Sequence, residues 1–324
     1  MYLSNKNKGV VLLSVLMVIL LLSSIAAYLG NKYFISLKRF AYLEYQTHAI
    51  NYYRGVESIS INRIKEEIDA NKKYLPRNHP LLNDTFSYEA NNGFIKTTVK
   101  DISNCINVNS LVRLENNQLK DNSENIKRVK KLFDLLEIDE IYANEFIDQA
   151  IDWIDKDSDP RPYGLEDYYY TGPLVNPKHY SGMRYFYDLN ELKSLPVSRI
   201  IGWNHIVENF CALPITERSY ININSFNKGE GIMLASAFEE LSIDDAEYVI
   251  FNMPEEGFDE LNTFFNNFSN IDFGDVYTDI NFSTNKFLLV SELITGEFNS
   301  KSQITIYYGN NKNGDILART YNGI

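Results

Sequence analysis

An uncharged segment near the N-terminus constrains this chain more than any other feature. Residues 10–29 carry no charge, and at about 1.5 Å per residue they span about 30 Å, the hydrocarbon thickness of a bilayer. The apolar core of a cleavable signal peptide is shorter, about 7–15 residues, although residues 24–27 offer an alternative cleavage sequence. The segment therefore predicts a membrane-spanning helix, with a signal peptide as the alternative.

The helical pattern continues beyond the apolar segment. No proline interrupts residues 30–75, and apolar residues recur there at spacings of four and three, as on one face of a helix. We therefore predict a single helix over residues 10–70, close to 90 Å long. Lysines and arginines flank both ends of the apolar segment, so charge alone does not orient it in a membrane. The predicted stripe consists of Tyr45, Ala49, Tyr52, Val56 and Ile59.

Length, composition and charge bound the class of protein. A chain of 324 residues is long enough for at least two hydrophobic cores, and its 44% hydrophobic and 14% aromatic residues supply them. The net charge of −12 opposes binding to nucleic acid. Phosphate-binding, serine-hydrolase and zinc-protease motifs are absent from the sequence, and its four histidines show no paired spacing. The sequence therefore predicts a folded protein that is not an enzyme.

The two cysteines allow two interpretations. Cys105 and Cys211 are far apart and belong to no CxxC or zinc-type pattern. In an oxidising compartment they could close one loop, which would stabilise the fold by about 4–5 kcal/mol in the chain-entropy model. They could equally remain separate buried thiols.

The rest of the chain alternates between strand and helix patterns. A hairpin is predicted around Asn91, Asn92 and Gly93, because these turn-forming residues separate two β-rich runs. Helical periodicity follows, and strand patterns return near the C-terminus. This order predicts an α+β fold whose sheet is split by a large all-helical insertion. The predicted strands are 85–90, 94–101, 285–294, 302–309 and 315–321, and the helical stretches include 129–155 and 229–268.

An acidic window offers the best candidate site. Asp155, Asp157, Asp159 and Glu166 occupy positions 1, 3, 5 and 12 of a twelve-residue window, the ligand spacing of a calcium loop. Pro160 stands where an EF-hand needs glycine, so another loop geometry would be required, with Asp167 and a backbone carbonyl completing the ligands. A solvated acidic loop without metal is the alternative.

Two Asn-x-Asn runs echo each other along the chain. Asn107 and Asn109 lie in the first run, and Asn222 and Asn224 lie in the second. Because asparagine side chains cap helices and form turns through their own backbone, we predict capping roles rather than ligand binding.

The N-terminus resembles that of the type IV pilin and pseudopilin class. A short basic leader ends in Gly9, and an apolar helix starts at once and runs on into an amphipathic half. The resemblance implies cleavage by prepilin peptidase after Gly9 and methylation of Val10. Most members carry glutamate at the fifth mature position, where this chain has Ser14. A missing carboxylate suits a subunit at the end of a filament, which has no neighbouring amine to pair with.

The body resembles the general secretion pathway protein K family, the large minor pseudopilins of type II secretion. The resemblance rests on the acidic segment 151–170, the run 188–195, the "FCALP" at 210–214 and the "ININSF" at 221–226. It implies a pilin-like long helix packed on a small antiparallel sheet, with a SAM-like or helix-turn-helix insertion. It also implies calcium in the acidic segment and a disulfide between Cys105 and Cys211.

The resemblance also implies partners and a location. The chain would be a single-pass inner-membrane protein with its body in the periplasm, and after assembly it would initiate and cap the pseudopilus tip. Its partners would be the minor pseudopilins I, J and H, the major pseudopilin filament and prepilin peptidase. A signal-anchored periplasmic binding or adhesive domain acting alone is the alternative; DNA binding is opposed by the charge and the membrane helix.

The predicted division is 1–9 leader, 10–70 helix, 71–111 first β part, 112–219 insertion with the calcium loop, 220–270 second helical module and 271–324 final β part.

Overall fold

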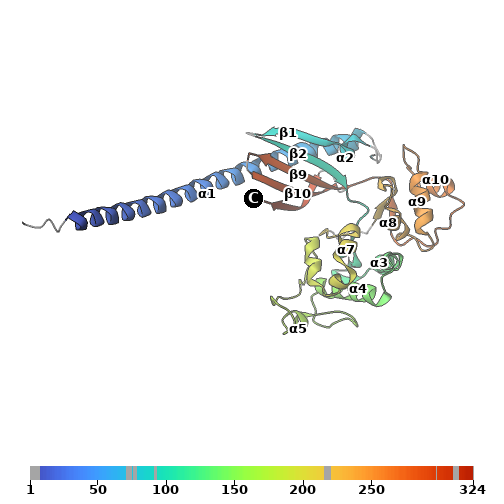
Figure 1. Cartoon of the computed structure of the whole chain (residues 1–324). Helices are drawn as coiled ribbons and strands as arrows, with labels where there is room; N and C mark the ends of the chain where they lie inside the picture. The colour runs from blue at the N-terminus through green and yellow to red at the C-terminus, as the bar shows by residue number, and fades with distance from the viewer. Residues whose placement is uncertain are drawn as a thin grey trace, which may run out of the picture.

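The computed structural model combines one long helix, one five-stranded sheet and two modules made mostly of helices (Figure 1). The leader before Lys8 and the predicted turn residues Asn91 and Asn92 lie outside the residues that the structure describes. The described residues are 8–70, 75, 79–90, 93–214, 220–296, 298–308 and 314–323.

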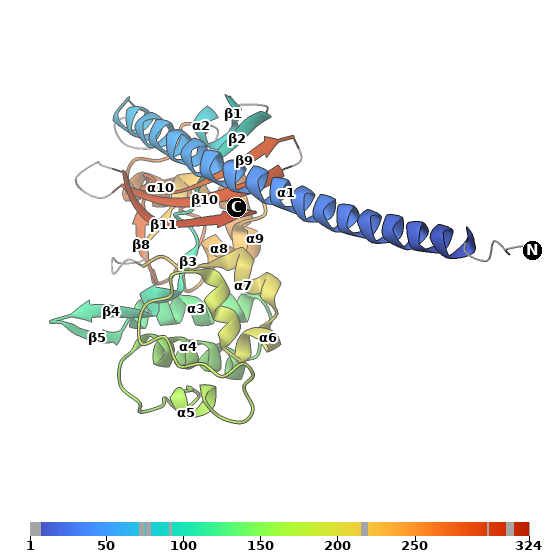
Figure 2. The ribbon, with the colours of Figure 1, turned by 90° about the vertical axis from the view of Figure 1, so that its left-hand side faces the viewer.

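The N-terminal helix α1 runs from Lys8 to Ala70, and its 63 residues span about 95 Å. Its N-terminal half projects from the body as an isolated rod (Figures 1 and 2). Its most apolar 18-residue window has a mean hydropathy of 2.9, and none of that window is buried by the rest of the protein. By length and composition this helix can cross a membrane, as the sequence predicted.

The C-terminal half of α1 packs on the sheet through a stripe that differs in part from the predicted one. Tyr45, Ala49 and Val56 are buried as expected. Tyr52 is only half-buried and Ile59 is 48% exposed, whereas Tyr53 and Ile64 are fully buried. Tyr52 still packs against this core from its edge, so only Ile59 was wrongly predicted. Spacings of three and four fit several neighbouring stripes, and the sheet alone decides which stripe it covers.

The five-stranded sheet is antiparallel throughout, and its strand order is β1-β2-β9-β10-β11. β2 precedes both helical modules in the sequence and β9 follows them, yet the two strands pair from Gly93 with Thr295 to Asp101 with Phe287. The α+β class and the split sheet are therefore confirmed. The bounds are β1 Thr85–Ala90, β2 Gly93–Asp101, β9 Lys286–Thr295, β10 Phe298–Tyr308 and β11 Gly314–Asn322, and the short helix α2 (Pro80–Asn83) precedes β1.

Polar contacts fix α1 on the sheet in addition to apolar packing. The hydroxyl groups of Tyr45 and Tyr53 both bond to the hydroxyl of Ser300 on β10. The carboxylate of Glu57, which is buried, accepts two hydrogen bonds of 2.8 Å from the guanidinium of Arg319 on β11. These contacts hold the rod in one rotation and one register relative to the sheet.

The first module contains a β-hairpin and is therefore not all-helical, which corrects that part of the prediction. Strands β4 and β5 pair around Asn116 and Asn117, whose φ angles are +51° and +62°. Asparagine tolerates this left-handed conformation, so the two residues close a tight hairpin turn. The elements are β3 Ile106–Asn107, η1 Val108–Leu111, β4 Val112–Glu115, β5 Gln118–Asp121, α3 Ser123–Leu135, α4 Glu140–Ile154, α5 Asp167–Tyr170, η2 Leu189–Ser194, α6 Val197–Ile201, α7 Trp203–Asn209 and β6 Phe210–Cys211.

The second module is smaller and shares one hydrophobic core with the first. Arg128 of α3, which is fully buried, donates to the Ser236 hydroxyl of the second module and to the Asn104 carbonyl, each at 3.4 Å. The shared core and this bridge join the two modules into one lobe, in which the first module lies below the sheet and the second lies beside it (Figure 1). The elements are β7 Tyr220–Asn222, η3 Ile223–Ser225, α8 Gly231–Ala235, α9 Ile243–Phe251, α10 Leu261–Asn267 and β8 Asp279–Asn281.

Candidate functional site

The acidic loop lies between α4 and α5 in the first module. α4 ends at Ile154, and Asp155 is its C-cap residue, whose extended backbone turns the chain away from the helix axis. Glu166 is the N-cap residue of α5, eleven positions later, and it is 1% exposed. The loop between them brings a carboxylate from each helix end to the same place.

Three of the five predicted ligands converge in this loop. One carboxylate oxygen from each of Asp155, Asp157 and Glu166 lies within 4.8 Å of the others, a spacing that a single cation can bridge. Both oxygens of Glu166 and Oδ1 of Asp155 are buried and have no hydrogen-bond donor in the described structure. Buried carboxylate oxygens without donors are costly, so the residues present fit a bound cation.

Asp159 and Asp167 lie outside this group. Asp159 is exposed, and its backbone N–H donates to Oδ1 of Asp157 at 3.0 Å. Oδ1 of Asp167 accepts from the N–H and the hydroxyl of Ser181, at 2.8 and 2.9 Å, so this carboxylate fixes the following loop instead.

Asp152 is an acidic neighbour that the twelve-residue window missed. It lies on the last turn of α4 and is fully buried; its Oδ2 accepts from the backbone N–H of Arg161 at 3.1 Å, and its Oδ1 has no donor in the described structure. A Cβ on Gly164 would collide with this carboxylate. The helical spacing from Asp148 through Asp152 to Asp155 was the available signal, because it places these carboxylates near one helix face.

The electrostatics of the loop agree with its geometry. The pKa of Asp155 is raised to about 7, mainly by burial and also by the charges of Asp157 and Asp152. The pKa of Glu166 is raised to about 7 and that of Asp152 to about 6, in both cases mainly by burial. The ionised form of these carboxylates is therefore energetically disfavoured, and a bound cation would offset both the cost of desolvation and the mutual repulsion.

Arg161 ties the loop to the β4–β5 hairpin. Its guanidinium forms a bidentate pair with Asp121 at the end of β5 and lies 3.7 Å from Oδ1 of Asp152. The positive charge of Arg161 thus balances part of the negative charge near Asp152 within the first module itself.

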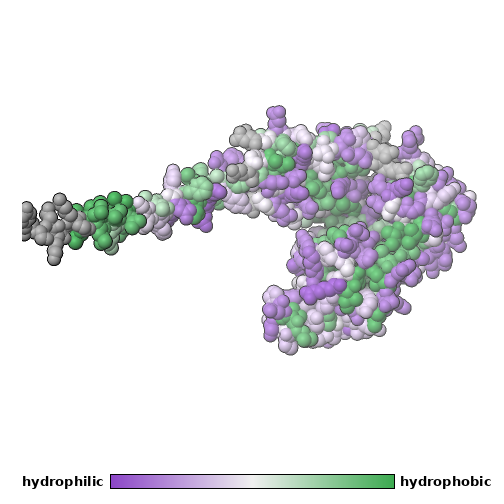
Figure 3. All heavy atoms as spheres, in the orientation of Figure 1, coloured by the Kyte–Doolittle hydropathy of each residue, from purple (hydrophilic) through white to green (hydrophobic). Residues whose placement is uncertain are grey.

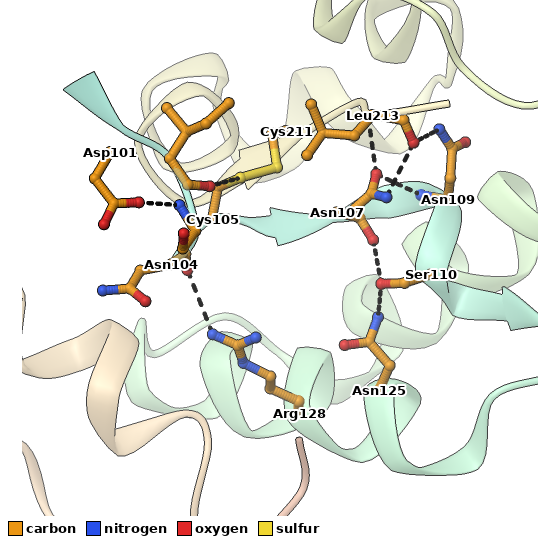
Figure 4. The surroundings of a disulfide bond; sticks show 12 residues. Asp101, Asn104, Cys105, Asn107, Asn109, Ser110, Asn125, Arg128, Cys211 and Leu213 are labelled. Atoms are coloured by element: carbon orange, nitrogen blue, oxygen red, sulfur yellow. Dashed lines mark hydrogen bonds between the residues drawn. A yellow bond between two sulfur atoms is a disulfide. The ribbon is translucent and has the colours of Figure 1, made fainter. Parts of the chain in front are cut away.

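The structure joins Cys105 and Cys211 in a disulfide, with their Cα atoms 5.7 Å apart (Figure 4). Cys105 immediately precedes β3, and Cys211 lies in β6, which pairs with β3 in parallel. The bond therefore closes the first module at the point where the chain enters it from the sheet and where it leaves.

The asparagine runs cap helices, which confirms the predicted role. Asn107 accepts from the N–H of Asn109 at the start of η1, and Asn222 accepts from the N–H of Asn224 at the start of η3. The second asparagine of each run also holds a distant backbone by reciprocal bonds, Asn109 with Phe186 and Asn224 with Phe258. The repeated sequence thus forms the same arrangement in both modules: one asparagine caps a short helix and the next one bonds to a distant backbone segment.

Comparison with known proteins agrees with this arrangement. The sequence model of the family described as type II secretion system protein K matches residues 104–214, which contain the acidic loop and both cysteines. The chain is 22% identical over 255 residues to a putative type II secretion system protein K of Escherichia coli K12, covering 78% of this chain and 77% of that protein. It is 24% identical over 295 residues to type II secretion system protein K of Dickeya chrysanthemi, covering 81% of each.

A solved structure shows the same fold. A chain in the crystal structure of the GspK-GspI-GspJ complex from the type 2 secretion system of enterotoxigenic Escherichia coli superposes with a TM-score of 0.72 at 19% identity, covering 86% of this chain and 96% of that one. The family match over residues 104–214, the curated relatives over about four fifths of the chain and this shared fold together support type II secretion system protein K as the family that this chain resembles.

Proposed function

We propose that this chain is the minor pseudopilin at the tip of a type II secretion pseudopilus, where it initiates and caps pilus assembly for the export of folded proteins across the outer membrane. The observation that carries the proposal is the rod of α1, whose residues 10–44 are exposed along their whole length. An apolar rod of this length needs lipid before assembly and neighbouring helices afterwards. The proposed role is structural rather than enzymatic.

Processing and location follow from the same helix. Cleavage by prepilin peptidase after Gly9 would leave Val10 as a methylated N-terminus in the inner membrane, with the body in the periplasm. The Ser14 hydroxyl donates to the carbonyl of Val11 at 2.9 Å, so this side chain is satisfied within its own helix. A subunit whose residue 14 needs no ion pair with the terminal amine of a neighbouring subunit suits the end of a filament.

The proposed partners are the minor pseudopilins I and J, packed along α1, with H and the major pseudopilin filament below them. The solved relative is a GspK-GspI-GspJ complex, which supports this choice. Capping is supported by the lobe of two modules, which lies beside the sheet at the end of α1 remote from the membrane (Figure 1). A further subunit stacked above would have to occupy the volume of that lobe.

The proposed calcium ion would be held by Asp155, Asp157 and Glu166. Bound there, it would supply positive charge to three carboxylates that otherwise repel one another. Its role would be to keep the loop between α4 and α5 compact, so the tip keeps one shape.

The N-terminal mass of the protein from membranes tests the proposal most directly. In cells with prepilin peptidase we expect a chain that starts at methylated Val10, and in cells without it an uncleaved chain. A start near Tyr28, or an uncleaved chain in both strains, would contradict processing as a pseudopilin.

Assembly is tested by purifying the chain together with the minor pseudopilins I and J and by imaging pili. Deleting the chain should reduce the number of pseudopili started and lengthen those that form, because both initiation and the cap are lost. Unchanged number and length, or failure to purify with I and J, would instead favour a periplasmic binding domain that acts alone.

A further inference from the structure

A groove of about 850 Å³ lies between the sheet and the lobe of two modules. Its floor includes Leu288, Gln303 and Thr305, which alternate along their strands with the residues that face α1, so the groove uses the opposite face of the sheet. Figure 3 shows the body hollowed between the sheet and the lobe beneath it. The volume is at the upper end of the range of about 300–1,000 Å³ seen for ligand pockets.

One wall of the groove is aromatic and apolar. It is formed by Tyr187, Trp203 and Val207, of which Tyr187 is 55% exposed and Val207 is 49% exposed. The ring of Trp203 already holds one cation, since Nζ of Lys193 lies 4.3 Å from its centroid. This wall can therefore receive both an aliphatic side chain and the stem of a lysine or arginine.

Carboxylates dominate the charge inside the groove. Among the described residues that line it are four carboxylates and one cation, Lys100; the carboxylates are Asp101, Asp188, Glu208 and Glu230. No lysine, arginine or histidine of the described chain forms an ion pair with any of these four carboxylates. Burial raises the pKa of Glu230, and the nearby charges of Asp101 and Glu247 act in the same direction. Within the described part of the chain, the groove thus presents four carboxylates, one lysine and no ion pair that neutralises the carboxylates.

The long-range charge distribution points to the same place. Residues 220–281 contain thirteen aspartates and glutamates and one lysine, which gives a net charge of −12, equal to that of the whole chain. The rest of the protein is therefore neutral overall. Because this second module supplies the wall that carries Phe226 and Glu230, its field draws cations toward the groove.

We infer that this groove binds a basic segment of a second protein, an extended peptide that carries lysine or arginine beside an apolar residue. The cationic group would face Glu230 and Asp101, and the apolar residue would rest on the wall formed by Trp203 and Val207. This site goes beyond the tip role, because none of its lining residues belongs to α1. It also lies apart from the acidic loop, none of whose residues lines it.

A short peptide tests the inference on the full-length protein in non-ionic detergent. The probe is a fluorescein-labelled peptide of sequence Gly-Lys-Leu-Arg-Leu-Gly, blocked at both ends, and its counterpart carries glutamate in place of lysine and arginine. We expect the basic peptide alone to bind, as measured by fluorescence anisotropy against empty micelles, and to change the emission of Trp203. The emission change should vanish in Trp203→Leu, whereas Trp153, which is buried in the first module, should not respond.

Matched charge variants distinguish specific binding in the groove from nonspecific attraction of a basic peptide to an acidic protein. Glu230→Gln should weaken binding about five- to tenfold, since one charge-assisted contact is lost. Glu256→Gln removes the same charge from an exposed site of the same module outside the groove, and binding should stay within about twofold. Equal effects of the two variants, or equal binding of the acidic peptide, would overturn the inference.

Folding of each variant is checked by its melting temperature. Should Glu230→Gln fail to fold, Asp188→Asn takes its place, because the new amide oxygen can still accept the bond from the N–H of Asn190. The result is independent of the tip role, since the peptide assay needs neither pseudopilin partners nor cleavage after Gly9.

Discussion

Asp155→Ala and Asp157→Ala, introduced together, should abolish the response of the protein to calcium. In the folded state the carboxylate oxygens of Asp155 and Glu166 lie within 4.8 Å, and at that distance two charges repel by about 3–4 kcal/mol at an effective dielectric constant of about 20. Asp157 is exposed, so its repulsion is weaker. A bound cation replaces this repulsion by attraction, and only the folded chain holds the three groups together.

The expected size of the response follows from linkage. At calcium concentrations about 100 times the dissociation constant, binding to the folded state alone adds about 2.7 kcal/mol to the free energy of unfolding. For a domain of 150–250 residues this corresponds to a rise of about 5–10 °C in melting temperature. The assay is thermal unfolding of the full-length protein followed by circular dichroism, with calcium or with chelator.

The double variant in calcium should melt near the temperature of the wild-type protein in chelator. Asp159→Ala is the matched control, because Asp159 lies in the same loop but its carboxylate is outside the group of three. It should keep the full calcium response. A calcium response that survives in the double variant, or one that is lost in Asp159→Ala, would refute the assignment of the ion to these three residues.

Three further changes test the fold that positions the loop and the groove. Ile64→Ala should lower the free energy of unfolding by about 2–5 kcal/mol in urea titrations, because Ile64 is fully buried between α1 and the sheet, whereas Ile59→Ala, at a residue 48% exposed, should change it by about 0.5 kcal/mol or less. Equal losses would contradict the observed stripe. Arg319→Ala should cost about 1–3 kcal/mol by the same assay, because it leaves the buried carboxylate of Glu57 without its two donors, and Lys301→Ala, which removes an exposed ion pair with Glu292 on the same sheet, should cost little. Cys105→Ser with Cys211→Ser should cost about 2–5 kcal/mol, since the bond spans 106 residues; reductant should then lower the stability of the wild-type protein but not of the double variant.

Much of the fold could be predicted because its signals are local. The span of α1, the strands near the C-terminus and the caps at Asn107 and Asn222 each depend on neighbours within a few residues. A helix follows from unbroken periodicity, and a cap follows from one side chain and the next two residues. The β4–β5 hairpin was missed although its signal, Asn116 followed by Asn117, was as local as the others.

The candidate site was only partly predictable from spacing. The twelve-residue window identified Asp155, Asp157 and Glu166, but it also included Asp159, and Asp167 was added as a further ligand. Spacing states how far apart residues are along the chain, whereas convergence depends on how the loop folds back. Ser181 holds Asp167 away from the group, and the close packing of Gly164 against Asp152 brings in a carboxylate that the window did not contain.

The sequence by itself determined the long apolar rod, the α+β class and the resemblance to a secretion pseudopilin, because each of these depends on composition and period along the chain. The tertiary structure alone decided which face of α1 is buried, which carboxylates share one place, and that a groove lies between the sheet and the lobe. These features join residues separated by up to 262 positions, as in the ion pair of Glu57 on α1 with Arg319 on β11. Their energies come from long-range packing, and a one-dimensional pattern does not specify which distant surfaces meet.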